Sequence, residues 1–364
     1  MGRRGMVSGL HMVASRAAAA SALAVLAPPS IVSASLTTQD IVDQIDLENY
    51  RHYLDDLLFT HLGDNRAPGA PEHDPARNNI EMTLESFGLD PYLDAFQYGA
   101  GTWYNVVAVK PGLVRPDRQY IICGHFDSVS NPGADDDASG CAAVMEIARV
   151  LSQYDFQSTI IFIAFDYHEG GPGRYGSTHY AEMHAGDDIR GVIAMDMIAH
   201  NVDLDVCDIL GREESDEVKL ALADAVGAYS GGLTARDLGH RDCCDHNPFE
   251  NVGKPACAVA AGDAPWANPC YHLPCDSVDT PGIIDYDYAV QIVRAVCGWL
   301  VDQARLIQPC PGDVDDNGIV EVADLLALLA AWGPCGECPE DINGDGTVNV
   351  GDLLALLAAW GDCP

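Results

Sequence analysis

Histidine and acidic side chains recur in this sequence just after short apolar segments. They are His125 and Asp127 after 119–123, the three aspartates 135–137 in the turn 132–140, Asp166, His168 and Glu169 after 159–165, Asp196 after 192–195, and His272 and Asp276 in the loop 271–276. Imidazole nitrogen and carboxylate oxygen are ligands that zinc prefers in enzymes. Two zinc ions can share one carboxylate, polarise a carbonyl group and activate water. The pattern therefore indicates a zinc-dependent hydrolytic site.

Each of these residues also has a purely structural explanation. A single histidine or aspartate at the end of a strand is usually a cap or a hydrogen-bond partner. The run of three aspartates at 135–137 is more typical of a turn or a helix N-cap. In the pair His125-x-Asp127, the aspartate suits a role in orienting the histidine ring. The coincidence of such groups at successive strand ends is what favours a metal site.

The apolar pattern around these residues predicts an α/β fold with a mixed, mostly parallel central sheet and helices on both faces. Near-continuous apolar runs are typical of strands buried on both sides, and the segments between them have helical spacing. The expected strands are 119–123, 159–165, 192–195 and 256–261, and the expected helices are 138–154, 176–185 and 286–303. Ligands of such sheets lie beyond the carboxyl ends of the strands, where the candidate residues fall.

Several separated motifs, taken in order, resemble the co-catalytic zinc aminopeptidases, relatives of glutamate carboxypeptidase and glutaminyl cyclase. The motifs are GHFDS at 124–128, PGADDDASG at 132–140, AMDM at 194–197, DHNPFENVGKPA at 245–256 and YHLPCDSVDT at 271–280. The resemblance implies that one zinc ion is bound by His125 and Asp196, that the other is bound by Glu169 and His272, that Asp136 bridges the two, and that Asp127 orients His125.

The sequence departs from this family after the second predicted strand. The family has two adjacent glutamates there, of which the first is the general base and the second a zinc ligand. This chain has His168 and Glu169 instead. We expect His168 to serve as the base, because imidazole titrates near neutral pH and can accept a proton from water. Two alternatives stay open: a zinc-binding homologue that has lost hydrolysis, or a local shift that makes Glu169 the base.

The expected activity is that of a zinc-dependent exopeptidase of the aminopeptidase type, with a peptide as its substrate. One alternative is a glutaminyl-cyclase-like acyltransferase, which resembles this site but uses a single zinc ion. Another is a carboxypeptidase, which needs a basic pocket for the substrate carboxylate. Arg174 and Arg241 are the nearby candidates for such a pocket.

The C-terminal part of the chain contains a repeat with an offset of 28 residues. Residues 313–324 and 341–352 each carry oxygen-bearing side chains at positions 1, 3, 5, 9 and 12 and a glycine at position 6, which is the spacing of a calcium loop. An almost identical apolar helix follows each loop, so we expect a small all-α module of two calcium-loop–helix units that binds two Ca²⁺ ions. The candidate ligands are Asp313, Asp315, Asn317, Glu321, Asp324, Asp341, Asn343, Asp345, Asn349 and Asp352.

This repeat resembles a type I dockerin module, which implies that residues 309–364 dock to a cohesin-type receptor or another extracellular surface. Four of the thirteen cysteines lie in it. Cys310 and Cys335 are 25 residues apart, as are Cys338 and Cys363, and we expect one disulfide in each repeat. A module of this size needs such bridges and its calcium to stay folded.

The remaining nine cysteines lie in the main body, so at least one of them is expected to be unpaired. Cys270 and Cys275 flank His272 and are expected to form a local bridge. A high cysteine content is typical of proteins from oxidising compartments.

Charge and the N-terminal segment bear on partners and location. The formal net charge is -36, which makes nucleic acid and anionic membrane surfaces unsuitable partners. Residues 1–34 have the features of a signal peptide: basic Arg3 and Arg4, an apolar run at 17–26 and small residues at 32–34. We therefore expect a secreted or extracytoplasmic protein without a membrane span in the mature chain, with its zinc peptidase domain at 35–308.

Overall fold

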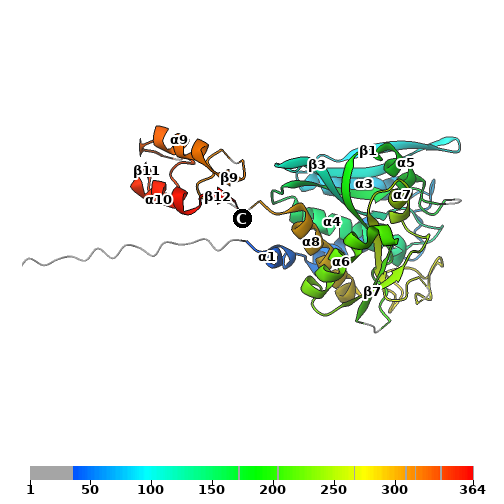
Figure 1. The fold of residues 1–364 in the computed structure, drawn as a ribbon. Helices are drawn as coiled ribbons and strands as arrows, with labels where there is room; N and C mark the ends of the chain where they lie inside the picture. The colour runs from blue at the N-terminus through cyan, green and yellow to red at the C-terminus, as the bar shows by residue number, and fades with distance from the viewer. Residues whose placement is uncertain are drawn as a thin grey trace, which may run out of the picture. The chain divides into compact units, whose positions relative to one another are not determined.

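The structure is a computed structural model that describes residues 36–170, 173–202, 205–265, 267–307, 310–315, 317–336 and 338–363. The predicted signal peptide at 1–34 lies outside the described residues, as does the predicted domain boundary at 308–309. Figure 1 shows an α/β domain and a small C-terminal module, which we describe separately.

The α/β domain is built on an eight-stranded sheet with the strand order β1-β2-β4-β3-β5-β8-β6-β7. The strands are β1 (Tyr92–Tyr98), β2 (Gly101–Lys110), β3 (Arg115–His125), β4 (Ser158–Phe165), β5 (Asp188–Met195), β6 (Val206–Leu210), β7 (Thr234–Gly239) and β8 (Ala256–Ala261). The central strands β4, β3, β5 and β8 pair in parallel, whereas β1, β2 and β6 add antiparallel pairings. The predicted mixed, mostly parallel sheet is confirmed.

The apolar composition of the central strands follows from burial on both faces. Every residue of β4 is buried. Side chains alternate along β3, so that Ile122 joins one apolar core whereas Ile121 and Cys123 join the other. Each face of the sheet therefore has its own core, which a run of β-branched residues can fill without polar interruption.

Helices cover both faces, as the sequence predicts (Figure 1). The helical segments are α1 (Thr38–Val42), α2 (Leu47–His52), η1 (Tyr53–Leu57), α3 (His73–Ser86), η2 (Ala134–Ala138), α4 (Ser139–Leu151), α5 (Tyr175–Met183), η3 (Glu213–Ser215), α6 (Asp216–Tyr229), α7 (His246–Asn251) and α8 (Tyr286–Ala304). Helices α1 to α4, α6 and α8 contribute to the larger core, and α5 and α7 contribute to the smaller one. No described helix is long and apolar enough to span a membrane.

The parallel register places the carboxyl ends of β3, β4, β5 and β8 at one edge of the sheet. His125 ends β3, and Phe165 of β4 pairs with it. Asp196 follows β5, and the loop that carries His272 follows β8. Segments that are far apart in sequence therefore deliver their polar residues to the same edge.

The C-terminal module contains two helices, α9 (Val322–Ala330) and α10 (Val350–Ala358), but it is not all-α as predicted. It also has two short antiparallel ladders, β9 (Ile319–Val320) with β12 (Gly361–Asp362), and β10 (Gly333–Pro334) with β11 (Thr347–Val348). Each ladder joins the loop of one repeat to the end of the other repeat's helix. A small core of Val320, Leu328, Val348 and Leu356 lies between the repeats.

The predicted disulfides of this module were wrong. The structure pairs Cys310 with Cys363 and Cys335 with Cys338, so neither bridge closes a repeat on itself. The reason is the exchange of ladders between repeats, which places the end of each helix beside the start of the other loop. The two bridges are equivalent under the 28-residue offset, as are the hydrogen bonds from Cys363 N to Gly318 O and from Cys335 N to Gly346 O, both 3.0 Å.

In the α/β domain the expected bridge between Cys270 and Cys275 is present. The free cysteines among the described residues are Cys123, Cys141, Cys207, Cys243, Cys244, Cys257 and Cys297. Cys243 is exposed and the other six are buried. The expectation of at least one unpaired cysteine in the main body therefore agrees with the structure.

Candidate metal centre and active site

Asp136 lies between two histidines at the carboxyl edge of the sheet. Its Oδ1 atom is 3.4 Å from Nε2 of His125, and its Oδ2 atom is 3.1 Å from Nε2 of His272. Nε2 of His272 is also 3.4 Å from Oε1 of Glu169. Nε2 of His125 is buried and has no hydrogen-bond partner. A buried imidazole nitrogen without a donor or acceptor partner is costly unless a cation fills that role.

The other predicted ligand, Asp196, approaches His125 from the end of β5. Ligand atoms of His125, Asp137 and Asp196 lie within 4.8 Å of one another, as do those of Asp136, Glu169 and His272. The structure thus brings all five predicted ligands into two adjoining groups, which the 3.4 Å contact between Asp136 and His125 connects. Nitrogen and carboxylate donors in such groups fit zinc.

The three consecutive aspartates have different tasks. The carboxylate of Asp276 accepts the backbone N–H groups of Asp135 and Asp136 at 2.9 and 3.1 Å. The carboxylate of Asp137 accepts the N–H of His125 at 3.0 Å, and that of Asp135 accepts amide groups from neighbouring loops. Of the three, only Asp136 forms ion pairs with histidine rings, those of His125 and His272. The flanking carboxylates hold the backbone and so fix its direction.

Two glycines let the backbone pass close to this site. Gly133 has φ +56°, and a Cβ atom there would lie 2.4 Å from the carbonyl oxygen of Asp136. A Cβ atom on Gly140 would lie 2.1 Å from the carbonyl oxygen of Met195. Any larger residue at either position would displace a ligand-bearing segment.

The predicted orienting role of Asp127 takes a different form. Nδ1 of His125 is 3.1 Å from the carbonyl oxygen of Asp127 and 3.6 Å from its carboxylate. The carboxylate instead accepts the backbone N–H groups of His168 and Glu169, both at 2.9 Å. Asp127 therefore orients His125 through its backbone and positions the two residues after β4 through its side chain.

His168 is held by a residue to which the sequence analysis assigned no role. Its Nδ1 atom is 3.0 Å from Oδ2 of Asp245, and the hydroxyl of Ser177 donates to Oδ1 of the same carboxylate at 2.5 Å. The His168 ring stacks on that of His125 with centroids 3.9 Å apart. Burial and the neighbouring His125 disfavour the charged imidazole, but Asp245 outweighs them and raises the pKa of His168 to about 9. Burial likewise disfavours charged Asp245, and His168 holds its pKa at about 2.

Tyr271 also faces the metal centre. Its ring stacks on that of His272 with centroids 3.8 Å apart. Burial, followed by the carboxylates of Asp136, Glu169 and Asp196, raises the pKa of the phenol well above its ordinary value. The phenol therefore stays protonated and remains a hydrogen-bond donor at neutral pH.

Arg174 and Arg241 do not form the basic pocket that a carboxypeptidase needs. Arg174 is engaged by Asp242, 2.8 Å from Nη2, and by Asn247, 3.0 Å from Nη1. Arg241 is exposed to solvent. The charge of Arg174 is thus already compensated, whereas the metal centre itself is surrounded by carboxylates.

The predicted calcium loops are also folded around their acidic residues. Asp313, Asp315 and Asp324 place ligand atoms within 4.8 Å of one another. In the first loop the carboxylate of Asp313 accepts the N–H groups of residues 317 and 318, and in the second that of Asp341 accepts those of residues 345 and 346. Asp324 and Asp352, at position 12, each accept the N–H of the residue at position 9 at 2.8 Å. The two loops therefore share one backbone arrangement.

Comparison with protein families decides the relationship of the α/β domain. The sequence model of peptidase family M28 matches residues 105–299, which is more than half of the chain. The chain belongs to this family. The M28 match spans β2 to α8 and includes every residue of the candidate metal centre.

Individual relatives are similar to different shares of this M28 chain. A probable zinc metalloprotease of Pyrenophora tritici-repentis is 40% identical over 105 residues, which are 26% of this chain and 21% of that protein. Leupeptin-inactivating enzyme 1 of Streptomyces exfoliatus is 28% identical over 281 residues, which are 70% of this chain and 61% of that protein. The chain therefore spans about a fifth of the length of the first relative and less than two thirds of the second.

Solved structures share the M28 chain's fold. The LapA aminopeptidase of Legionella pneumophila has a TM-score of 0.62 and 19% identity, with 73% of this chain and 74% of that chain covered. Glutaminyl cyclase of Macrostomum lignano has a TM-score of 0.61 and 18% identity, with 77% and 96% covered. At this level of identity the likeness concerns the fold, which aminopeptidases and cyclases have in common.

Proposed function

We propose that this chain is a secreted exopeptidase of the aminopeptidase type that hydrolyses peptide bonds at a two-zinc site. The observation that carries the proposal is the placement of Asp136, whose two carboxylate oxygens face His125 and His272 separately. A carboxylate in this position is suited to bridging two cations. The membership in peptidase family M28 supports a hydrolytic metallopeptidase.

In the proposed assignment, His125 and Asp196 would hold one zinc ion, Glu169 and His272 would hold the other, and Asp136 would serve both. When bound, the ions would supply Lewis-acid polarisation of the scissile carbonyl and lower the pKa of water. The protein supplies a rigid frame for these ligands, since Asp127, Asp137 and Asp276 fix the backbone from which they project.

The proposed general base is His168. Its Nδ1 atom faces Asp245, which favours the tautomer with the proton on Nδ1 and leaves the lone pair on Nε2. Nε2 then accepts a proton from the attacking water and returns it to the leaving amine. The stacked ring of His125 and the hydrogen bond to Asp245 together restrict the imidazole to one orientation.

The electrostatics favour a substrate with a free amino terminus. Two bound zinc ions would compensate the charges of Glu169, Asp196 and Asp136, but the chain as a whole has a formal net charge of -36. An ammonium group is attracted by such a field and a carboxylate is repelled. The phenol of Tyr271, which stays protonated, can donate a hydrogen bond to a substrate carbonyl oxygen.

The test is hydrolysis of a panel of aminoacyl and dipeptide substrates by the zinc-loaded chain starting at residue 35. The variants Asp136→Ala and His168→Glu are measured alongside, with Asp224→Ala, at an exposed position of α6, as the matched control. The proposal predicts chelator-sensitive turnover in the natural protein and in the control, and its loss in Asp136→Ala. No turnover on any substrate would contradict it.

Two other outcomes identify the competing functions. Release of ammonia from an N-terminal glutamine substrate, by a protein that binds one zinc ion, would indicate a glutaminyl-cyclase-like acyltransferase. An inactive natural protein whose His168→Glu variant hydrolyses peptides would indicate a zinc-binding homologue that has lost catalysis. The zinc content of each protein is measured in the same samples.

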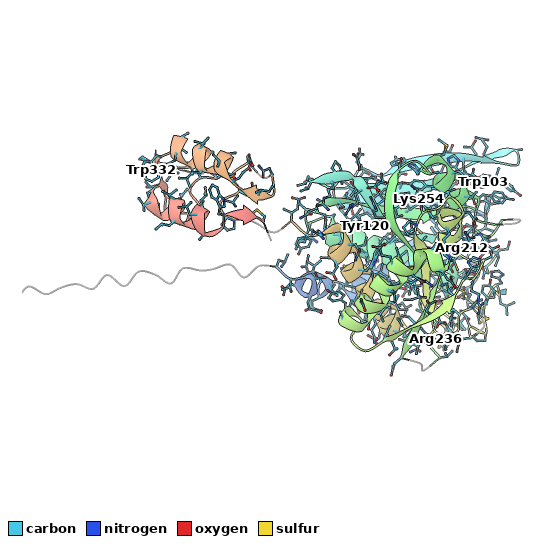
Figure 2. All side chains as sticks on the ribbon, in the orientation of Figure 1. Trp103, Tyr120, Arg212, Arg236, Lys254 and Trp332 are labelled. Atoms are coloured by element: carbon cyan, nitrogen blue, oxygen red, sulfur yellow. A yellow bond between two sulfur atoms is a disulfide. The ribbon has the colours of Figure 1, made fainter. Side chains whose placement is uncertain are left out.

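For the C-terminal module we propose two bound Ca²⁺ ions and docking to a cohesin-type receptor. Both helices expose the same apolar stripe, and Figure 2 labels Trp332 just beyond the end of α9. Leu326 is 61% exposed and Leu354, its equivalent, 62%. The full stripes are Val322, Leu326, Leu329 and Trp332 in one repeat and Val350, Leu354, Leu357 and Trp360 in the other. Apolar side chains exposed in this way are typical of protein interfaces.

The docking proposal is tested by calcium-dependent binding of the full chain to a cohesin-type domain. Joint substitution of Leu326 and Leu354 by serine is expected to abolish binding and leave peptide hydrolysis unchanged. The proposed location, outside the cytoplasm after removal of residues 1–34, is tested by N-terminal sequencing of the protein recovered from culture medium. An intact N-terminus in the cytosolic fraction would contradict it.

A further inference from the structure

Arg66 is a fully buried arginine between η1 and α3. Its guanidinium donates hydrogen bonds to backbone carbonyls: Nε to Phe126 O at 2.7 Å, Nη2 to Gly133 O at 2.8 Å, and Nη1 to Pro132 O. Among the residues that the structure describes, no carboxylate forms an ion pair with it. A buried charge without an ion-pair partner is costly, so its carbonyl contacts need an explanation.

The carbonyls that bind Arg66 belong to the two segments that carry the metal ligands. Phe126 stands between His125 and Asp127, and Gly133 precedes Asp136 by three residues. The backbone N–H of Arg66 also donates to the hydroxyl of Ser128, 3.1 Å away. That hydroxyl donates to Asn131 O at 2.7 Å and so closes the turn between the segments. The guanidinium fork therefore connects both segments at a fixed separation.

The charge of Arg66 acts on the carboxylates that hold the backbone. Burial lowers the pKa of Arg66, and the thiol of Cys141 with the carboxylates of Asp276, Asp127 and Asp137 opposes this effect. These three carboxylates are the acceptors of the N–H groups that fix the ligand segments. A permanent cation that interacts with all three compensates part of their mutual repulsion.

We propose that Arg66 is a positioning residue for the shared ligand Asp136, because its buried guanidinium sets the distance between the His125 segment and the Asp136 segment. The inference rests on the proposed two-zinc site and adds a residue that determines its affinity. Asp136 must reach two cations at once. A small displacement of its segment therefore weakens the binding of the less tightly held zinc ion more than that of the other.

Zinc binding, measured by competition with a chromogenic chelator, tests this directly. We expect the natural protein to bind two zinc ions and Arg66→Lys to lose at least about tenfold in affinity for the weaker one, as is typical when a partner behind a ligand is removed. Lysine keeps the charge but cannot reach several carbonyls in the fork geometry. Arg149→Lys is the matched control. Arg149 lies on α4 and also donates to a backbone carbonyl, that of Gln44 at 2.6 Å.

A second variant changes the contact between Arg66 and the Asp136 segment without changing a charge. A Cβ atom on Gly133 would lie 3.1 Å from Nη2 of Arg66 and 2.4 Å from Asp136 O. Gly133→Ala is therefore also expected to lower the affinity for the less tightly held zinc ion. It keeps the proposal testable if Arg66→Lys fails to fold.

A purely structural role for Arg66 gives a different result. Zinc stabilises the folded chain according to its affinity, so the zinc-induced rise in melting temperature reports on binding even without turnover. If Arg66→Lys and Gly133→Ala lower the melting temperature in chelator but keep the full zinc-induced rise and both affinities, the inference is wrong. A natural protein that binds two zinc ions without hydrolysing peptides would contradict the proposed activity alone. One that binds a single ion would overturn both.

Discussion

Asp245 accepts a hydrogen bond from Nδ1 of His168 at 3.0 Å, across 77 residues of sequence. Both side chains are almost fully enclosed, with 2% of Asp245 and 12% of His168 exposed. The pair lies beside His125, whose ring stacks on that of His168. The histidine that replaces the family's usual glutamate is thus provided with a carboxylate that can orient it and stabilise its charged form.

Substitution of Asp245 by asparagine is expected to lower the maximal rate of peptide hydrolysis by about 10- to 100-fold, since the loss of a partner that orients a functional histidine typically costs on that scale. It should also shift the pH dependence. Asp245 raises the pKa of His168, so the unprotonated base appears only at higher pH in the natural protein. Without the carboxylate this pKa falls, and the acid limb of the kcat profile moves to lower pH.

The pH profile of kcat, measured with one dipeptide substrate, checks this expectation. Ser177→Ala, which removes the hydroxyl that donates to the other oxygen of Asp245, should have a smaller effect in the same direction. An acid limb that stays in place in Asp245→Asn would argue against His168 as the group that titrates.

Asp127→Asn should separate positioning from metal binding. Both carboxylate oxygens of Asp127 accept backbone N–H groups, from His168 and Glu169. An asparagine offers one acceptor oxygen and places an NH₂ group against the other N–H. We expect the His168–Glu169 segment to shift, with a drop in kcat of at least about tenfold.

The zinc content of Asp127→Asn, measured by atomic absorption, accompanies its kinetics. Two bound zinc ions with a reduced kcat are the expected result. An unchanged kcat would show that these two N–H groups need no common acceptor.

The disulfides of the C-terminal module are a direct test of its topology. Proteolysis of the unreduced protein, followed by mass spectrometry, should yield a peptide that joins Cys310 to Cys363 and another that contains the bridge from Cys335 to Cys338. Bridges from Cys310 to Cys335 and from Cys338 to Cys363 would mean that each repeat closes on itself, contrary to the ladders that connect the repeats.

Calcium removal should destabilise the module. A ligand at 100 times its dissociation constant stabilises the folded state by about 2.7 kcal/mol. We expect this stabilisation to be lost when Asp324 and Asp352 are replaced by alanine, because both carboxylates are buried at position 12 of their loops. Calorimetry of the full chain with calcium and with a calcium chelator measures the effect. Glu340→Ala, just before the second loop and outside its ligand positions, should keep the full calcium response.

The sequence alone determined the layered framework of the α/β domain. The strand predicted at 256–261 has the same bounds in the structure. The helix predicted at 286–303 extends one residue further, to Ala304. Burial on both faces leaves a long apolar signature, and it can be recognised without knowledge of the partners. The candidate ligands could be predicted for a related reason: in a parallel sheet the carboxyl ends of the strands meet at one edge, so position in sequence implies proximity in space.

The tertiary structure decided the contacts that join distant segments. Asp245, Asp276 and Arg66 act on ligand segments from 60 to 141 residues away. Asp245 and Asp276 lie within motifs that carry the family resemblance, but their spacing gives no indication of their hydrogen-bond partners. The same limit explains the wrong disulfides of the repeat. Spacing along a chain describes each repeat by itself, whereas the exchange of short ladders between two repeats depends on their packing.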